Sequence, residues 1–348
     1  MNVTQRRRFL VKTALFAVAL GITLFFVLLP GVIDRQMNAV HQAAPYSVDK
    51  PTSELHRQLF IADLHADSLL WQRDLLQRSS YGHVDLPRML ESNIGLQVFS
   101  AVTKTPRSLN FERNDASTDN ITALAIAQRW PIRTWTSCFE RAIYQATLLH
   151  RLSKRSHGSL VIIRNQKDLI RYLRQRQSGL AITAGLLAVE GLHALDGEFI
   201  NLEKLYTAGY RMMGLTHFFD NAIGGSAHGI DKGGLSEFGY KALAEMERLG
   251  IIIDLAHASP QLIADVLAFV TRPVVVSHTG VKGTCDRRRN LSDSQLRSIA
   301  DNGGLIGIAY FSEAVCDTDV QSIVAAMRYV SNLIGVEHVA LGSDFDGA

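Results

Sequence analysis

From residue 59 onward, short apolar runs alternate with segments of helical periodicity. Eight runs have the length of a strand, and they cover residues 60–65, 95–101, 180–189, 211–216, 251–255, 273–277, 304–309 and 338–342. Amphipathic helices are predicted between them, over residues 118–155, 238–249, 260–269, 292–302 and 320–333. Near-continuous apolar strands separated by helices are typical of a parallel sheet that is covered on both faces.

Eight such strands favour a (β/α)8 barrel, the TIM-type α/β fold, over an open doubly wound sheet. The usual nucleotide-binding signature of the open sheet, Gly-x-Gly-x-x-Gly, does not follow the first predicted strand. The sequence ends at Ala348, shortly after the eighth strand, so we expect a barrel domain over residues 56–348 that lacks its final helix. Without this cover, we expect a less stable and more aggregation-prone domain than a form extended at its C-terminus.

The N-terminal segment has a different pattern. A basic stretch over residues 1–12 precedes an uncharged apolar run over residues 13–33. About 20 apolar residues can span a bilayer. Basic residues precede the run and none directly follow it, which places the N-terminus in the cytoplasm and the rest of the chain outside it. A buried core helix fits this run badly, because the run has no polar face. Residues 34–55, with Pro45 and Pro51, are expected to form a linker.

Two interpretations of the apolar run compete. It is either a retained transmembrane anchor or a cleaved export signal, which would be of the twin-arginine type given Arg-Arg-Arg-Phe-Leu-Val-Lys. The length of the run and the absence of a clear small-x-small cleavage motif after it favour the anchor. The catalytic domain would then lie outside the cytoplasm, on the periplasmic side of the inner membrane in a bacterium.

Composition narrows the class of protein. The chain is 47% hydrophobic and 20% charged, as in ordinary globular proteins, and its net charge is only +3. It shows no basic field of the kind that binds nucleic acid. Cys138, Cys285 and Cys316 form no Cys-x-x-Cys motif, which argues against a zinc ribbon or a redox centre. Outside the cytoplasm one disulfide could form, and we expect it between Cys285 and Cys316.

Residues that can bind a metal follow several of the predicted strands. His65 and Asp67 close the first strand two positions apart, and in an extended strand both would point to the same side. An imidazole and a carboxylate placed in this way suit a divalent metal. Residues of the same kinds end later strands: Glu190, His217, His257, His278 and Asp344. In a barrel, the C-terminal ends of the strands are where catalytic residues lie.

Each of these residues also has a structural explanation. A single histidine such as His257 or His278 is more often a hydrogen-bonded core residue than a ligand, and Asp254 is expected to be structural. Glu190, however, would be a costly buried carboxylate unless it is paired or bound to metal. The structural explanation would have to hold independently at five strand ends, so a metal site is favoured. The ligands exceed the needs of one zinc and suit two metals bridged by Glu190.

From Asp63 to Gly347 the chain resembles the membrane (renal) dipeptidase family, which are zinc peptidases of the amidohydrolase type. The resemblance rests on eight segments that occur in order: Asp63-Leu-His65-Ala-Asp67, Val189-Glu190-Gly191-Leu-His193, Leu215-Thr216-His217-Phe-Phe-Asp-Asn221, Gly234-Leu-Ser-Glu-Phe-Gly239, Gly250-Ile-Ile-Ile-Asp254-Leu-Ala-His257-Ala-Ser259, Pro273-Val-Val-Val-Ser277-His278, Arg288-Arg289-Asn290-Leu-Ser-Asp293 and Gly342-Ser-Asp344-Phe-Asp346-Gly347.

The resemblance implies two zinc ions per chain. His65 and Asp67 would hold the first ion, His257 and His278 would hold the second, and Glu190 would bridge them. The implied reaction is the hydrolysis of a dipeptide by a hydroxide that bridges the two ions.

Three further residues would act on the substrate. The resemblance implies that His217 faces the substrate and stabilises the oxyanion, and that Asp344 relays a proton to the departing amine. Arg289 would bind the C-terminal carboxylate of the dipeptide through its planar guanidinium group. Four neighbouring residues receive no role and are expected to be solvated or structural: His193, His228, Arg287 and Arg288.

Other functions stay open at this point. The chain could be another amidohydrolase-type enzyme, such as a lactonase or a deaminase, or a non-catalytic anchored protein that binds a metal or a partner. The partners expected for the dipeptidase are a dipeptide substrate and a membrane that holds the N-terminal segment. Both a monomer and a homodimer are compatible with the sequence.

Overall fold

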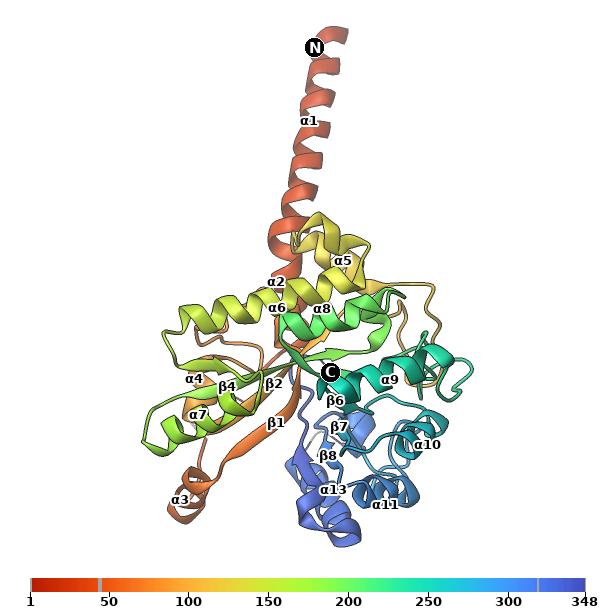
Figure 1. Cartoon of the computed structure of the whole chain (residues 1–348). Coiled ribbons are helices and arrows are strands. Elements are labelled where there is room, and N and C mark those ends of the chain that lie inside the picture. The colour runs from red at the N-terminus through yellow and green to blue at the C-terminus, as the bar shows by residue number, and fades with distance from the viewer. Residues whose placement is uncertain (1, 43–45, 318, 348) are drawn as a thin grey trace.

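The computed structural model describes residues 2–42, 46–317 and 319–347 of the chain. Its centre is a closed ring of eight parallel strands: β1 (Ile61–Ala66), β2 (Ile94–Val102), β4 (Thr183–Glu190), β5 (Tyr210–Gly214), β6 (Ile252–Asp254), β7 (Val275–Thr279), β8 (Leu305–Ile308) and β9 (Val339–Leu341). The ring closes because β2 pairs with β4 and β9 pairs with β1. The predicted TIM-type barrel is therefore confirmed (Figure 1).

One strand of the sheet was not predicted. The short β3 (Leu160–Ile162) pairs with the first half of β4, and Leu160 lies opposite Thr183. One edge of β4 pairs with β2. The other edge pairs with β3 in its first half and with β5 in its second half, so β3 lies outside the ring. Three residues between two helices give no periodicity that a sequence pattern can detect.

Helices surround the ring (Figure 1). Four match the predicted segments closely: α9 (Glu237–Leu249), α10 (Pro260–Phe269), α11 (Asp293–Asp301) and α13 (Val320–Ile334). The others were not predicted as separate helices: α4 (Leu86–Glu91), α5 (Asn120–Ala127), α6 (Cys138–Arg155), α7 (Gln166–Gln177), α8 (Ile200–Ala208) and α12 (Ser312–Val315).

The single helix predicted over residues 118–155 is wrong, because the chain breaks between α5 and α6. Arg129 adopts a left-handed conformation with φ of 57°, and Pro131 follows two residues later. Proline lacks the N–H that a helix interior needs and favours an extended residue before it. The second helix then begins at Cys138 and is capped by Ser137, whose side chain accepts a hydrogen bond from the Glu140 N–H.

The ends of the matched helices carry the expected capping residues. The Ser259 side chain accepts a hydrogen bond from the Leu262 N–H, and Pro260 occupies the first position of α10. In α11, Ser292 and Gln295 form a reciprocal capping box. Helix α9 ends at Gly250, whose φ of 70° is a left-handed conformation that favours glycine. These caps explain why the patterns located these helices well.

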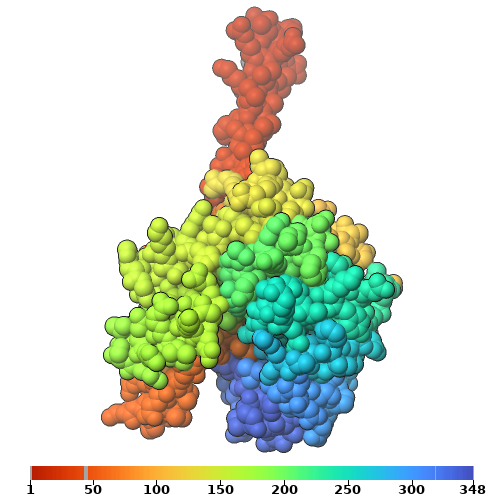
Figure 2. Space-filling model, viewed as in Figure 1, coloured from red at the N-terminus to blue at the C-terminus, as the bar shows by residue number. Residues whose placement is uncertain are grey.

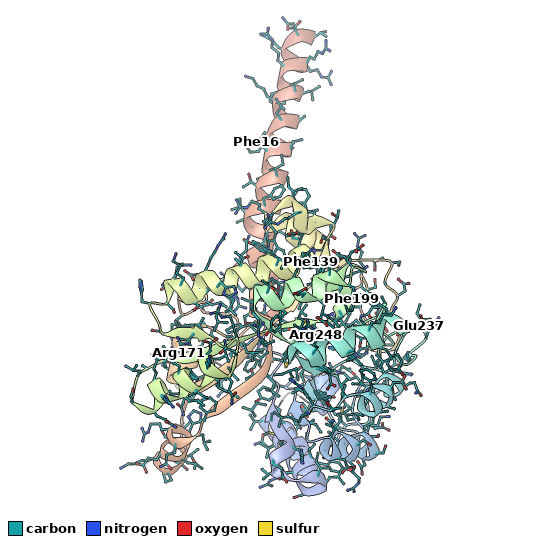
Figure 3. All side chains as sticks on the ribbon, in the orientation of Figure 1. Phe16, Phe139, Arg171, Phe199, Glu237 and Arg248 are labelled. Atoms are coloured by element: carbon teal, nitrogen blue, oxygen red, sulfur yellow. A yellow bond between two sulfur atoms is a disulfide. The ribbon has the colours of Figure 1, made fainter. Side chains whose placement is uncertain are left out.

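The N-terminal segment forms one continuous helix over Val3–Met37, composed of α1 (Val3–Thr23), a π-helical turn (Leu24–Leu28) and α2 (Leu29–Met37). It is long and apolar enough to cross a membrane, and α1 projects from the barrel (Figures 1 and 2). Phe16 lies on this projecting part and is 69% exposed (Figure 3).

The expected linker over residues 34–55 is partly helical. Helix α2 continues to Met37, and α3 (Lys50–Gln58) begins inside the same range. The Asp49 side chain caps α3 by accepting a hydrogen bond from the Thr52 N–H. Residues 43–45, which include Pro45 of that range, lie outside the described residues.

The strands place their side chains in two layers. Ala188 and Met212 pack with other apolar side chains inside the ring, whereas Leu187 and Met213 pack outward into the larger core beneath the helices. Alternation along β4 then directs Glu190 inward, two residues beyond Ala188, at the C-terminal end of the barrel. The fold thus places a carboxylate over the centre of the ring.

Candidate active site

Glu190 lies at the centre of a group of histidines. Its Oε1 atom is 3.0 Å from His257 Nε2, 3.4 Å from His278 Nε2 and 3.7 Å from His65 Nε2. Its Oε2 atom is 3.1 Å from His217 Nε2. All five side chains are buried. Strands β1 and β7 and the loops after β5 and β6 therefore direct histidine nitrogens at one carboxylate, which belongs to β4.

Two aspartates extend this cluster on the β1 side. His65 Nε2 lies 3.3 Å from Asp67 Oδ1 and 3.8 Å from Asp344 Oδ1. Asp67 comes just after β1, where the backbone has left the extended conformation with φ of −97° and ψ of 25°. The predicted proximity of His65 and Asp67 holds, but it arises from this turn and not from a shared strand face.

The predicted ligands fall into three groups in which the ligand atoms lie within 4.8 Å of one another: His65, Glu190 and His278; Glu190, His217 and His257; His65, Asp67 and Asp344. Glu190 and His65 each belong to two of the groups. His217 and Asp344, which were predicted to act on the substrate, each belong to a group as well. The structure therefore brings the predicted metal and substrate residues into one site.

Three of the histidines are in a state that suits metal binding. Burial lowers the pKa of His217, His257 and His278 well below the usual value for histidine. They are therefore neutral at physiological pH, and a neutral imidazole has the lone pair that a metal requires. His257 Nε2 and His278 Nε2 face each other at 2.8 Å, so their lone pairs converge on the same small space.

The carboxylates create an excess of negative charge. Burial raises the pKa of Glu190, and the nearby Asp67 carboxylate raises it further. Burial also raises the pKa of Asp344, to about 7. Burial alone would lower the pKa of His65, but Asp67 and Glu190 outweigh it and raise that pKa to about 10. His65 Nε2 and Asp67 Oδ1 lie 3.3 Å from each other, and neither forms a hydrogen bond among the described residues. A divalent cation would supply the missing positive charge and the missing partner, so the residues present fit a metal.

Ser277 and Asp254 orient two of the histidines. The Ser277 hydroxyl donates to Asp254 Oδ2 at 2.6 Å and lies 3.3 Å from His65 Nδ1 and 3.0 Å from His278 Nδ1. Because its own hydrogen points to Asp254, this oxygen can only accept from the ring nitrogens. A neutral ring that donates from Nδ1 has a bare Nε2 on the side of Glu190, which is the tautomer needed for metal binding, and a bound cation would favour that neutral form of His65. The structural role expected for Asp254 is confirmed, whereas the role of Ser277 was missed.

Replacing Ser277 with alanine should lower zinc affinity about 10- to 100-fold, the usual effect of removing a hydrogen bond that orients a metal ligand. The change removes one hydroxyl and leaves every ligand in place. Zinc affinity is measured by competition with a chelating dye. Ser100→Ala is the matched control, because Ser100 is also buried and its hydroxyl has no partner within the described part of the chain. Equal affinities for the two variants would contradict the orienting role.

Arg289 approaches the same site from the loop after β7. It is only 8% exposed, and its Nη2 donates to the His278 carbonyl oxygen at 3.0 Å. Its guanidinium carbon lies 4.8 Å from the centre of the Phe311 ring, and its Nε is buried with no partner in the described residues. Burial lowers the pKa of Arg289, and Asp344 works against that effect. A free N–H on a fixed guanidinium group is suited to an anionic ligand.

A cavity of about 670 Å³ connects these residues. It is lined by Arg289 and by five residues of the histidine and carboxylate cluster: Asp67, Glu190, His217, His257 and Asp344. Its volume lies within the range of roughly 300–1,000 Å³ found for small-molecule sites. A substrate in this cavity would contact Arg289 and the cluster at the same time.

The loop that carries Arg289 is held by the expected disulfide. Cys285 and Cys316 are joined, and Cys138 is free. Next to Arg289, the Asn290 Nδ2 donates to the carbonyl oxygens of Cys285 and Ala314 at 2.7 and 2.8 Å. The loops after β7 and β8 are therefore fixed to each other near the site.

Two residues of the site have an unusual backbone conformation. His257 and Asp344 both have φ of 62°, a left-handed conformation that is uncommon for residues other than glycine. Such residues concentrate at functional sites, where the surrounding fold offsets a cost of about 1–3 kcal/mol each. Each residue lies three positions beyond the end of a barrel strand, in the turn that follows β6 or β9.

The residues that received no role are placed differently from one another. His228 is buried and His193 is half-buried, so neither is a solvated surface residue. His193 Nε2 lies 2.9 Å from Thr103 Oγ1, and His228 Nδ1 lies 2.8 Å from the Phe111 carbonyl oxygen. Burial lowers the pKa of each to about 3. Arg287 and Arg288 are about half exposed and pair with surface glutamates.

Comparison with known proteins agrees with this site. The family model for membrane dipeptidase, peptidase family M19, matches residues 50–348. Dipeptidase C965.12 of Schizosaccharomyces pombe is 30% identical over 274 residues, which are 76% of this chain and 61% of the relative. Dipeptidase aclJ of Aspergillus oryzae is 29% identical over 85% of this chain and 69% of its own. The chain thus spans about two thirds of the length of these relatives.

Solved structures show the same fold. The probable dipeptidase PvdM from Pseudomonas aeruginosa superimposes with a TM-score of 0.69 at 18% identity, over 85% of this chain and 86% of the other. A metallopeptidase from Rhodobacter sphaeroides, solved with a phosphinate mimic of the dipeptide L-Ala-D-Ala, gives a TM-score of 0.64 at 22% identity, over 83% and 87% of the two chains. With a family model that matches most of the sequence, the chain belongs to the membrane dipeptidase family, peptidase family M19.

Proposed function

We propose that this protein is a zinc-dependent dipeptidase with two metal ions per chain. His65 and Asp67 would hold one ion, His257 and His278 the other, and Glu190 would be shared. The observation that carries the proposal is the placement of Glu190, which has three histidine Nε2 atoms within 3.7 Å of a single carboxylate oxygen. When bound, such a metal pair lowers the pKa of water so that a hydroxide nucleophile is available near neutral pH.

The protein's own residues would position the dipeptide. Arg289 binds the C-terminal carboxylate with its free Nε–H, and this places the peptide bond over the cluster. His217 Nε2, which now faces Glu190 Oε2 at 3.1 Å, would donate to the oxygen of the attacked carbonyl in the tautomer that carries its hydrogen on Nε2. Asp344, which lines the same cavity, passes a proton to the departing amine. Requiring a carboxylate one residue beyond the scissile bond would restrict the enzyme to dipeptides.

The direct test is a substrate panel on the purified, zinc-loaded full chain. We expect hydrolysis of free dipeptides and no comparable turnover of lactones or of aminated nucleobases. Preferred turnover of a lactone or a deamination substrate would favour another amidohydrolase-type reaction. Zinc binding without turnover of any of these compounds would favour a non-catalytic protein.

We further propose that the N-terminal helix anchors the protein with the catalytic domain outside the cytoplasm, on the periplasmic side in a bacterium. The basic residues precede the apolar segment, which favours this orientation. The Cys285–Cys316 disulfide supports it, because disulfides persist mainly in oxidising compartments. A homodimer stays a prediction.

The orientation can be measured with a pair of reporters fused after residue 55. Alkaline phosphatase should be active there, because it requires export, whereas a fluorescent protein that folds only in the cytoplasm should stay dark at the same position. The opposite pattern, a bright fluorescent fusion with an inactive phosphatase, would show that the domain is cytoplasmic.

A further inference from the structure

The cavity of the candidate site has a wall that does not belong to the barrel. Phe25, Leu29, Ile33 and Met37 of the N-terminal helix line it together with Glu190, His217 and Arg289. These four residues are spaced four apart and therefore lie along one face of the helix. We call them the helix wall. Three of them belong to residues 13–33, which were predicted only to cross a membrane, and Met37 lies in the predicted linker. Both parts contribute to the space in which a substrate would bind.

The end of this helix is built into the catalytic domain by buried polar contacts. Asp34 is 3% exposed and lies 3.2 Å from Arg73 Nε. Arg73 Nη2 is in turn 2.9 Å from Asp346 Oδ2, two residues beyond Asp344. Asn38 Nδ2 donates to Asp34 Oδ1 at 2.8 Å, and the Asn38 carbonyl oxygen accepts from the Gly82 N–H at 2.6 Å. Removing the helix would leave Arg73 without one of its two buried partners, so the docking is specific.

The surroundings of the helix wall are apolar. Ile33 packs against a buried cluster that includes Leu70 and Trp71 from the loop after β1, and Ile121 from α5. Leu70, Trp71 and Ile121 also line the cavity. The cavity therefore has a charged floor, formed by the histidines and carboxylates, and an apolar chamber beside the helix. A dipeptide of two glycines would leave this chamber unfilled.

The order of the strands around the ring indicates which end of a dipeptide would reach the chamber. In the order β1, β2, β4, β5, β6, β7, β8, β9, strand β7 lies opposite β2. Arg289 follows β7, whereas the chamber lies at the C-terminal ends of β1 and β2. Val102, the last residue of β2, and Trp71, in the segment after β1, line it. A dipeptide whose carboxylate binds Arg289 would extend across the cluster with its amino-terminal residue directed to the helix wall.

We propose that the helix wall is a specificity-determining part of the substrate site, and that it selects dipeptides whose amino-terminal residue carries a large apolar group. The inference rests on the dipeptidase function proposed above. It also requires that the mature protein retains the helix through Asn38. An apolar group in this chamber is removed from water on both sides, by the barrel and by the helix, and this burial is the source of the selectivity.

The test compares two double variants of the full chain in detergent. Leu29→Ala/Ile33→Ala shortens the helix wall, and Leu28→Ala/Val32→Ala makes similar changes at neighbouring positions, where Leu28 and Val32 are 52% and 57% exposed. The measured quantity is the ratio of kcat/KM for Phe-Gly to kcat/KM for Gly-Gly. We expect the ratio to fall at least about tenfold in the wall variant, the scale of lost apolar contacts in a pocket, and to be unchanged in the control variant.

Three outcomes would overturn the inference, and they can be told apart. An unchanged ratio in the wall variant, whether or not both substrates lose activity equally, would show that the helix wall does not select the substrate. An intact mass showing that the mature protein begins beyond Asn38 would show that the helix is absent from the working enzyme. If the parent protein hydrolyses no dipeptide at all, the proposed function itself fails, and the inference fails with it.

Discussion

Replacing Glu190 with alanine is expected to abolish both zinc binding and dipeptide hydrolysis. Its Oε1 atom is the only carboxylate oxygen in the described part of the chain within 3.7 Å of His65, His257 and His278 at once. Removing it separates the two sets of ligands and leaves the histidines without their shared anion. We expect kcat/KM to fall by at least about 10³-fold, equivalent to about 4 kcal/mol of transition-state stabilisation.

The measurement pairs metal analysis with kcat/KM for a dipeptide. Glu237→Ala is a suitable control, because Glu237 lies exposed at the start of α9 (Figure 3). It should retain both zinc and activity. A Glu190→Ala protein that keeps its zinc and turns over substrate at the parent rate would contradict the shared ligand.

Arg289→Lys is expected to impair dipeptide hydrolysis by roughly 1.5–3 kcal/mol, the scale of a charge-assisted hydrogen bond. Lysine keeps the charge but loses the planar group that lies against Phe311 and donates to the His278 carbonyl oxygen. Arg288→Lys should have little effect, because Arg288 is about half exposed and pairs with Glu112 on the surface.

The substrate supplies an independent check of the same contact. Dipeptides with an amidated C-terminus lack the carboxylate, so the parent enzyme should hydrolyse them poorly and the loss should be smaller in Arg289→Lys. Equal rates for amides and free acids in the parent enzyme would mean that Arg289 does not bind the carboxylate.

The strands and the barrel could be predicted because their signals are local. Apolar runs of strand length recur between amphipathic helices, and the caps at Ser259 and Ser292 mark where two helices begin. The errors are local too. Strand β3 is too short to show a period. The break between α5 and α6 depends on Arg129 and Pro131, and the prediction missed it because it followed the helical periodicity of residues 118–155 as a whole.

The metal ligands could be predicted from their positions at strand ends and from the family resemblance. The hydrogen-bonding residues that hold these ligands in place could not be predicted. Ser277 lies 3.3 Å from His65 Nδ1 across a separation of 212 residues, and no local pattern indicates such a contact. Asp346 occurs in a matching segment, but its contacts with Arg73 and Ser68 appear only in the folded chain. The helix wall was missed for a similar reason. An apolar run predicts a helix that can cross a membrane, but it does not show which part of the barrel domain the end of that helix packs against.

The central claim, two zinc ions held by one cluster through Glu190, is tested most directly by titrating metal-free protein with zinc while following dipeptide hydrolysis. The account predicts that activity reaches its maximum at two zinc ions per chain, with Glu190→Ala showing neither tight binding nor activity. Full activity at one zinc ion per chain would contradict the shared site.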